Sequence, residues 1–136
     1  MILVDTSGWY ASIIATDPAH AAVVEWLEQS TDTLLTTDYI VDETLTLLLV
    51  RGHKDKAIRW AEQILAGNLC TVHYVTESEF LDAWYTFRDY VDKQWSFTDC
   101  VSKVIVKQLG ISQALSLDEH FRQFGSVTVV PSIRTV

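Results

Sequence analysis

Cysteine, proline and glycine are scarce in this chain of 136 residues, which contains two, two and five of them respectively. Cys70 and Cys100 lie far apart and lack the CxxC or Cys/His spacing of a zinc site, so we expect two free, partly buried thiols. The four histidines are scattered and give no zinc pattern either. Because the chain has no repeat, low-complexity segment or obvious linker, residues 1–136 are predicted to form a single domain.

Long apolar runs are also absent from the chain. No stretch approaches the roughly 18 apolar residues of a membrane span, and the N-terminus lacks the basic region of a secretory signal. Hydrophobic residues make up 49% of the sequence and charged residues 21%, as in an ordinary globular protein and unlike a disordered one. We therefore expect a cytoplasmic protein that does not associate with a membrane.

Basic residues are also few in this chain. Ten lysines and arginines face eighteen aspartates and glutamates, which gives a net charge of −8. Nucleic-acid binders usually carry a basic surplus, so this balance argues against tight, non-specific binding of nucleic acid. It does not exclude a metal-dependent nuclease, because cations neutralise clustered carboxylates. A negative surface would also suit a basic protein partner.

Short apolar strands alternate with helical patterns along the chain. Strands separated by helices favour a parallel sheet with right-handed crossovers and helices on both faces. We therefore predict an α/β fold of three layers, α/β/α, with a central, mainly parallel sheet of about five strands. The predicted strands are 2–4, 33–37, 70–75, 114–117 and 127–130, and the predicted helices are 9–14, 17–29, 38–51, 55–66, 76–91, 96–110 and 119–124.

Two aspartates directly follow predicted strands. Asp5 comes after the buried strand 2–4, and Asp118 comes after the strand 114–117. If both strands are central and parallel, the two carboxylates leave the sheet at the same edge, where α/β proteins place their active sites. Each aspartate could instead be the N-cap of the helix that follows it.

Two further acids lie on predicted helices. Glu43 has Ile40 and Leu47 as its neighbours on the helix face, and a carboxylate in an apolar stripe is costly to bury without a partner. We therefore predict that Glu43 is directed toward the interior or a cleft; the alternative is a boundary residue with its carboxylate in water. Asp99 is near the start of a helix. Its alternative role is a favourable interaction with the positive end of the helix dipole, with Lys103 as its i+4 ion-pair partner.

Four such acids need a common reason to converge, because crowded carboxylates repel one another and stay ionised only when cations lie between them. A set of oxygen ligands without histidine or cysteine suits Mg²⁺ or Mn²⁺ rather than zinc. Such ions activate water and stabilise negative charge on a phosphodiester during hydrolysis. The pattern thus favours nuclease chemistry.

Four segments, which together span nearly the whole chain, carry a recognisable pattern. They are Leu3-Val4-Asp5-Thr6-Ser7, Asp42-Glu43, Asp92-Lys93-x-x-Ser96-x-Thr98-Asp99-Cys100, and Ser116-Leu117-Asp118-Glu119-His120-Phe121 followed by Phe124-Gly125. On these segments the chain resembles a PIN domain, and most closely the VapC-type ribonuclease toxins. The order and spacing of the third and fourth segments make the resemblance specific.

The resemblance implies a Mg²⁺- or Mn²⁺-dependent endoribonuclease with a PIN-like fold. It also implies a homodimer that is silenced by a small antitoxin protein, whose tail fills the active-site groove. Ser116 replaces the threonine usual in the family, and the acidic composition is a second departure. Carried over by position, the acidic quartet is Asp5, Glu43, Asp99 and Asp118, with Asp5 and Asp99 as direct metal ligands and Thr6, Thr98 and Ser96 as supporting hydroxyls.

Several basic residues are candidate RNA contacts. Lys103 and Lys107 are four residues apart on one helix face and could face phosphates, although a solvated helix face is the plain alternative. The further candidates are Arg51, Lys93, Lys54 and Lys56. We expect Trp26, Trp60 and Trp84 to lie in the core or in a dimer interface rather than to stack on bases.

Two other functional classes remain in view. One is a catalytically silent PIN-like module that binds RNA or a partner protein; the presence of all four acids argues against it. The other is a phosphotransferase. Enzymes of the haloacid-dehalogenase kind need a second aspartate two residues after the first, where this chain has Ser7, and receiver domains need adjacent acids that this chain lacks.

Overall fold

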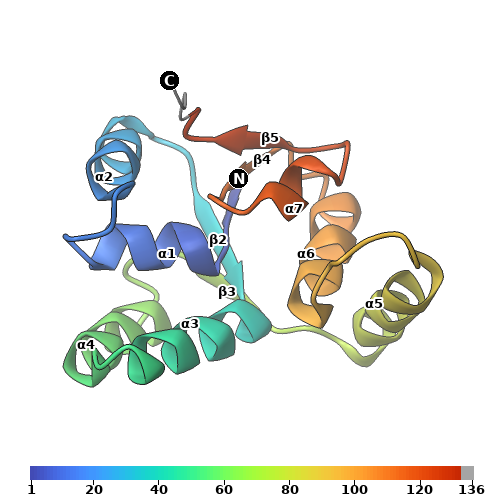
Figure 1. The fold of residues 1–136 in the computed structure, drawn as a ribbon, viewed down its shortest axis with the longest axis horizontal. Helices are drawn as coiled ribbons and strands as arrows, with labels where there is room; N and C mark the ends of the chain where they lie inside the picture. The colour runs from blue at the N-terminus through green and yellow to red at the C-terminus, as the bar shows by residue number, and fades with distance from the viewer. Residues whose placement is uncertain (133–136) are drawn as a thin grey trace.

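A central sheet of five parallel strands organises the protein, for which a computed structural model describes residues 1–132. In Figure 1 the helices α1 to α4 lie to the left of the strands and α5 to α7 to the right, so the sheet forms the middle of three layers. The predicted α/β/α fold is thereby confirmed, and every strand pair is parallel. In the spatial order β3-β2-β1-β4-β5, the strands are Thr71–His73, Leu34–Thr37, Ile2–Val4, Gln113–Leu115 and Thr128–Val130.

Seven helices connect these strands within the described residues. They are α1 (Thr6–Ile13), α2 (His20–Gln29), α3 (Asp38–Val50), α4 (Lys54–Leu65), α5 (Glu77–Asp89), α6 (Phe97–Gln108) and α7 (Glu119–Arg122).

Two helix starts differ from the sequence prediction. Helix α1 begins directly after β1, because Asp5 caps it and leaves no intervening loop. Helix α2 begins at His20 rather than at Asp17-Pro18, since the Asp17 carboxylate accepts the backbone N–H of Ala19 and Pro18 stays in the turn before the helix.

Strand β1 lies at the centre of the sheet, between β2 and β4, and all three of its residues are buried. This explains its unbroken apolar run, because both of its faces are covered by helices. Helix α1 packs closely on the end of β4: a Cβ at Gly8 would lie 2.7 Å from the carbonyl oxygen of Leu115. Glycine at this position therefore allows the residues after β1 and after β4 to approach each other.

The tryptophans divide between core and surface. Trp60 is buried and packs edge-on against Trp9, with 5.6 Å between ring centroids. Trp26 is half-buried against the core, whereas Trp84 is exposed on α5.

Cys70 and Cys100 are free, as predicted. Among residues 1–132, none of the helices combines the length and the hydrophobicity that crossing a bilayer requires.

Candidate active site

Asp5 is a buried carboxylate at the carboxyl end of the central strand. Its Oδ1 accepts hydrogen bonds from the Gly8 backbone N–H at 3.0 Å and from the Ser7 hydroxyl at 2.7 Å, and its Oδ2 accepts one from the Ser116 hydroxyl at 2.7 Å. Burial raises the pKa of Asp5 to about 6; these hydrogen bonds oppose the shift, and the negative charge of Asp118 adds to it. The fold thus holds a carboxylate in a place where its charge is poorly compensated.

Two serine hydroxyls join Asp5 to the segment after β4. The Ser116 hydroxyl oxygen accepts the Asp118 backbone N–H at 3.0 Å, and the Ser7 hydroxyl oxygen accepts the Leu117 backbone N–H at 2.8 Å. Both hydroxyls also donate hydrogen bonds to Asp5, so they connect the carboxyl end of β1 to that of β4. Both contacts of Ser116 use only its hydroxyl group, which a threonine would also supply.

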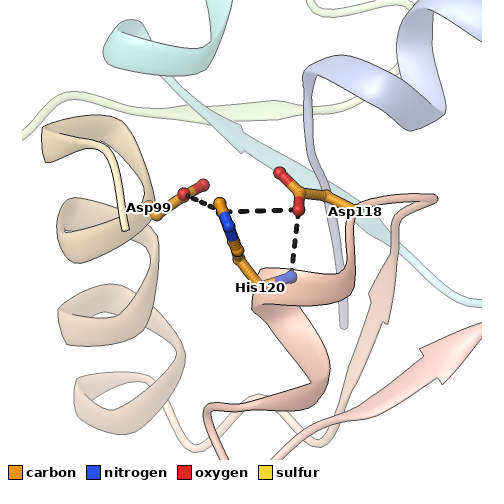
Figure 2. Close-up of side chains that lie close together, drawn as sticks. All are labelled: Asp99, Asp118 and His120. Carbon is orange, nitrogen blue, oxygen red and sulfur yellow. Dashed lines mark hydrogen bonds and ion pairs between the residues drawn. The ribbon is translucent and has the colours of Figure 1, made fainter. Parts of the chain in front are cut away.

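Asp99, Asp118 and His120 form a compact group at the same edge (Figure 2). The His120 Nδ1 lies 2.9 Å from the Asp99 Oδ2 and 3.4 Å from the Asp118 Oδ1. One ligand atom from each of the three residues can be chosen so that all lie within 4.8 Å of one another. Two sequence segments that are 21 residues apart thereby meet in one site.

Helix caps fix the orientation of these carboxylates. The Asp118 Oδ1 accepts the His120 backbone N–H at 3.0 Å and so caps α7. Asp99 and Ser96 form a capping box at the start of α6, in which the Asp99 Oδ2 accepts the Ser96 backbone N–H at 3.0 Å. The predictions of Asp118 as an N-cap and of Asp99 as an acid in the first turn of α6 are therefore confirmed, and these bonds hold both carboxylates in place.

Glu43 is outside this group. It is exposed on α3, whose buried face runs through Ile40, Thr44 and Leu48. The prediction that Glu43 is directed into the interior is therefore wrong, and the boundary interpretation describes its exposure. Its neighbour Asp42 is exposed as well. Among the described residues, Glu43 belongs to no set of three potential metal ligands.

The predicted supporting hydroxyls differ in their contacts. Ser96 bonds Asp99 as described, whereas the Thr6 hydroxyl is buried and has no hydrogen-bond partner within residues 1–132. Thr98 is half-buried in the first turn of α6. Sequence reasoning placed weight on Thr6, and the hydroxyls that contact Asp5 are those of Ser7 and Ser116.

The predicted RNA-binding side chains do not form one exposed strip. Lys103 is half-buried, and its Nζ lies 5.8–5.9 Å from the ring centroids of Tyr90, Trp95 and Phe124. Lys107 is exposed, one turn further along α6. Two other candidates have local contacts: the Arg51 guanidinium lies 4.8 Å from the Tyr10 ring centroid, and the Lys93 Nζ is 3.8 Å from the Asp92 carboxylate. Lys54 is exposed and Lys56 is half-buried.

A sequence model of the PIN domain matches residues 2–127. The chain belongs to the PIN-domain family. It is 31% identical over 132 residues to a Mycobacterium tuberculosis protein named 23S rRNA-specific endonuclease VapC20, covering 96% of this chain and 99% of that protein. It is 28% identical over 136 residues to Ribonuclease VapC26 of the same organism, covering 96% of this chain and all of that protein.

Solved structures agree with this assignment. The crystal structure of M. tuberculosis VapC20, described as a sarcin-ricin loop cleaving toxin, superposes with a TM-score of 0.87 at 28% identity, covering 93% of this chain and 97% of that one. The structure of FitAcB from Neisseria gonorrhoeae shares the fold, with a TM-score of 0.69 at 18% identity and coverage of 95% and 96%. The resemblance of this PIN domain to the VapC-type toxins is thereby confirmed.

The donor set of this PIN domain fits a divalent cation. Within residues 1–132, Asp99 and Asp118 have His120 as their salt-bridge partner, and no lysine or arginine neutralises them. Buried Asp5 lies next to Asp118 and raises the negative charge of the site. The ligand atoms within 4.8 Å of one another come from Asp99, Asp118 and His120, and Asp5 is a further carboxylate beside Asp118 rather than a member of that set. Carboxylates gathered in this way match the preference of Mg²⁺ and Mn²⁺ for oxygen-rich sites.

Sequence reasoning missed His120. The spacing of the histidines does not indicate a site at His120, because its partner Asp99 is 21 residues away in the chain. One signal was available, since His120 is two residues after Asp118 and therefore in the same turn at the carboxyl edge of the sheet.

Proposed function

We propose that this PIN domain is a metal-dependent endoribonuclease that hydrolyses RNA phosphodiester bonds and acts as the toxin of a type II toxin–antitoxin pair. The observation that carries the proposal is the convergence of Asp5, Asp99 and Asp118 from three separate segments at one edge of the sheet. The names of the VapC relatives support the same activity.

Asp5, Asp99 and Asp118 would hold the Mg²⁺ or Mn²⁺ ion. The Asp5 Oδ1 accepts two hydrogen bonds and the Oδ2 accepts one, so the Oδ2 keeps a lone pair for a cation. A bound divalent ion supplies two things at such a site: a lowered pKa for bound water, and stabilisation of negative charge on the phosphate.

The chain itself orients the reacting groups. Ser7 and Ser116 fix the Asp5 carboxylate, and the capping box at Ser96 fixes that of Asp99. Asp118 is the most exposed of the three acids and is the residue we assign to accept the proton of the attacking water. Its backbone contact to Ser116 keeps it beside Asp5 during the proton transfer.

Glu43 remains our proposed fourth acid, which would approach the site from α3 when substrate or cation is bound. Asp42 provides a matched control, because it is an exposed acid next to Glu43 on the same helix. Glu43→Gln should lower the rate of RNA cleavage, while Asp42→Asn should leave it unchanged. Equal rates for both variants would remove Glu43 from the quartet and leave an active site of three carboxylates.

Structured ribosomal RNA is the substrate class we propose. The VapC20 relative matches over nearly its whole length and is named for 23S rRNA, and its structure is described as that of a sarcin-ricin loop cleaving toxin. With a net charge of −8, this chain would rely on a few local cations rather than on a wide basic surface. Primer extension on ribosomal RNA after incubation with the protein would locate the cut; cleavage of unstructured RNA alone would argue against this class.

The partners we propose are a small antitoxin and a second copy of the chain, in the cytoplasm. The negative net charge favours a basic antitoxin segment. Light scattering coupled to gel filtration distinguishes the 15.4 kDa monomer from a dimer. A monomer at all concentrations would reject the homodimer.

A catalytically silent module that binds RNA or a partner protein is the second candidate, favoured by the position of Glu43 outside the acid group. Cleavage assays with Mg²⁺, Mn²⁺ or EDTA decide between the two. We expect metal-dependent cleavage that is lost in EDTA and in Asp5→Asn. No cleavage, together with no thermal stabilisation by either ion, would favour the silent module.

A further inference from the structure

We propose that His120 contributes a nitrogen ligand to the divalent cation of this site and thereby gives the protein a preference for Mn²⁺ over Mg²⁺. The proposal deepens the nuclease function described above and rests on it for the presence of a cation. It concerns a residue outside the acidic quartet, and its argument starts from the contacts in Figure 2.

The spacing of the three groups suits coordination of one ion. In an octahedral site with metal–ligand distances of about 2.1 Å, neighbouring ligand atoms lie about 3 Å apart. The His120 Nδ1 is 2.9 Å from the Asp99 Oδ2 and 3.4 Å from the Asp118 Oδ1. These two separations are those expected of adjacent ligands, and the ligand atoms of all three residues lie within 4.8 Å of one another, so small side-chain movements would let one ion contact all three.

Contacts of its own backbone and of the next residue hold His120 in place. Its backbone N–H is bonded to the Asp118 carboxylate at 3.0 Å, and the next residue, Phe121, is buried in the core. The short helix α7 is thus anchored by Phe121, while His120 on the same turn reaches Asp99. An imidazole held this way loses little conformational freedom when it binds a metal.

The ring can present a lone pair to a metal. In the absence of an ion, the 2.9 Å contact is a hydrogen bond in which the Nδ1–H donates to Asp99. Coordination through Nδ1 requires the other tautomer, with the proton on Nε2. Within residues 1–132 Nε2 has no hydrogen-bond partner, and the side chain is 31% exposed, so water can solvate Nε2–H.

An imidazole ligand changes the selectivity of the site. Mg²⁺ demands an oxygen octahedron and retains several waters, whereas transition ions accept nitrogen ligands more readily. A site of carboxylates alone would bind the two family ions with similar geometry. Replacing one oxygen by the His120 nitrogen should therefore favour Mn²⁺, and this preference should disappear when the imidazole is removed.

Pulsed electron paramagnetic resonance of the full chain with Mn²⁺ tests the proposal directly. We expect electron spin-echo modulation from a directly bound ¹⁴N, replaced by the ¹⁵N pattern in protein labelled with ¹⁵N-histidine. Neither experiment needs a variant that could misfold. A Mn²⁺-bound wild-type protein without nitrogen coupling overturns the proposal, and so does a wild-type protein that binds no Mn²⁺.

Calorimetric titration with each metal alone supplies the second readout. His120→Gln keeps an amide that can contact Asp99 but removes the imidazole, and His53→Gln, at the start of α4, is the matched control. We expect Mn²⁺ affinity to fall at least about tenfold in His120→Gln, with a smaller loss for Mg²⁺ and no change in the control. An unchanged ratio of Mn²⁺ to Mg²⁺ affinity overturns the proposal.

The two proposals fail in different ways. Mn²⁺-dependent RNA cleavage by a protein without nitrogen coupling would reject the His120 ligand and leave the nuclease function intact. Nitrogen coupling from His120 in a protein that cleaves no RNA would support the ligand and reject the nuclease function.

Discussion

Replacing Asp5 by asparagine should stabilise the metal-free protein at neutral pH while abolishing RNA cleavage. Burial raises the pKa of Asp5 from 3.8 to about 6. Each unit of such a shift corresponds to about 1.4 kcal/mol, so ionised Asp5 destabilises the fold by about 3 kcal/mol. Asparagine carries no charge, fits the same space, and is also a good N-cap for α1.

The direction of the pH dependence follows from the raised pKa. Below pH 3.8 Asp5 is protonated in both the folded and the unfolded chain and costs nothing. Between pH 3.8 and about 6 the unfolded chain loses this proton first, so stability falls as the pH rises, and above pH 6 the whole cost is present. The stability advantage of Asp5→Asn should therefore grow through this range and then level off.

Urea unfolding in EDTA measures this advantage. Dividing about 3 kcal/mol by a urea m-value of about 1–3 kcal/mol/M, we expect the midpoint of Asp5→Asn at pH 7 to be higher by an amount on the order of 1–3 M, and the gap to close as the pH falls below about 4. Asp17→Asn is the control, because the Asp17 carboxylate also accepts a nearby backbone N–H, that of Ala19, but lies in the turn before α2. Adding Mn²⁺ should stabilise the wild type and leave Asp5→Asn unchanged.

A lower stability of Asp5→Asn at pH 7 would refute this reasoning. It would mean that the hydrogen bonds from Ser7, Gly8 and Ser116 stabilise the carboxylate by more than burial destabilises it. Asp5 would then be a satisfied structural cap rather than a strained ligand.

Three further predictions concern the hydrogen bonds of Ser116 and Glu79. Ser116→Ala removes the hydroxyl that donates to Asp5 and should slow RNA cleavage about 10–100-fold, while Ser116→Thr should retain activity. Initial velocities of RNA cleavage test this, and equal velocities for the two variants would contradict it. Glu79→Gln should lower the free energy of unfolding at pH 7 by about 1.5–3 kcal/mol, because His73, Thr76 and Gln108 bond the buried carboxylate; guanidinium unfolding tests it. Burial raises the Glu79 pKa, but the contacts with Thr76 and His73 outweigh burial and lower it overall. The wild-type advantage should therefore be present above the ordinary glutamate pKa and fade only as the pH falls through the lowered value.

The sequence predicted the fold well where local and tertiary signals agreed. The unbroken run in β1 indicated a central strand, and the Thr76–Glu79 capping box marked the start of α5 correctly. At Asp17-Pro18 a strong local start signal was overridden, because the Asp17 carboxylate caps a turn instead of the helix. The His20 ring, at the first residue of α2, also contacts the Ala11 carbonyl oxygen of α1 at 2.7 Å, and local sequence does not encode such a contact.

The site was predicted less completely. For Asp5 and Asp118 the sequence offered a cap or a ligand, and the structure shows that a carboxylate can cap with one oxygen and leave acceptor capacity on the other. Periodicity alone placed Glu43 on the apolar stripe, but the side of α3 that faces the core runs along Ile40 and Thr44 and leaves Glu43 at its exposed edge. Only the tertiary fold reveals which edge of such a stripe is covered.

Anomalous diffraction from crystals soaked in Mn²⁺ tests most directly whether Asp5, Asp99 and Asp118 share one cation site. We expect a single strong peak at the carboxyl edge of the sheet, within about 2.3 Å of a carboxylate oxygen of Asp99 and facing Asp5 and Asp118. A protein that cleaves RNA with Mn²⁺ but shows its manganese peak on another face of the molecule would contradict this assignment.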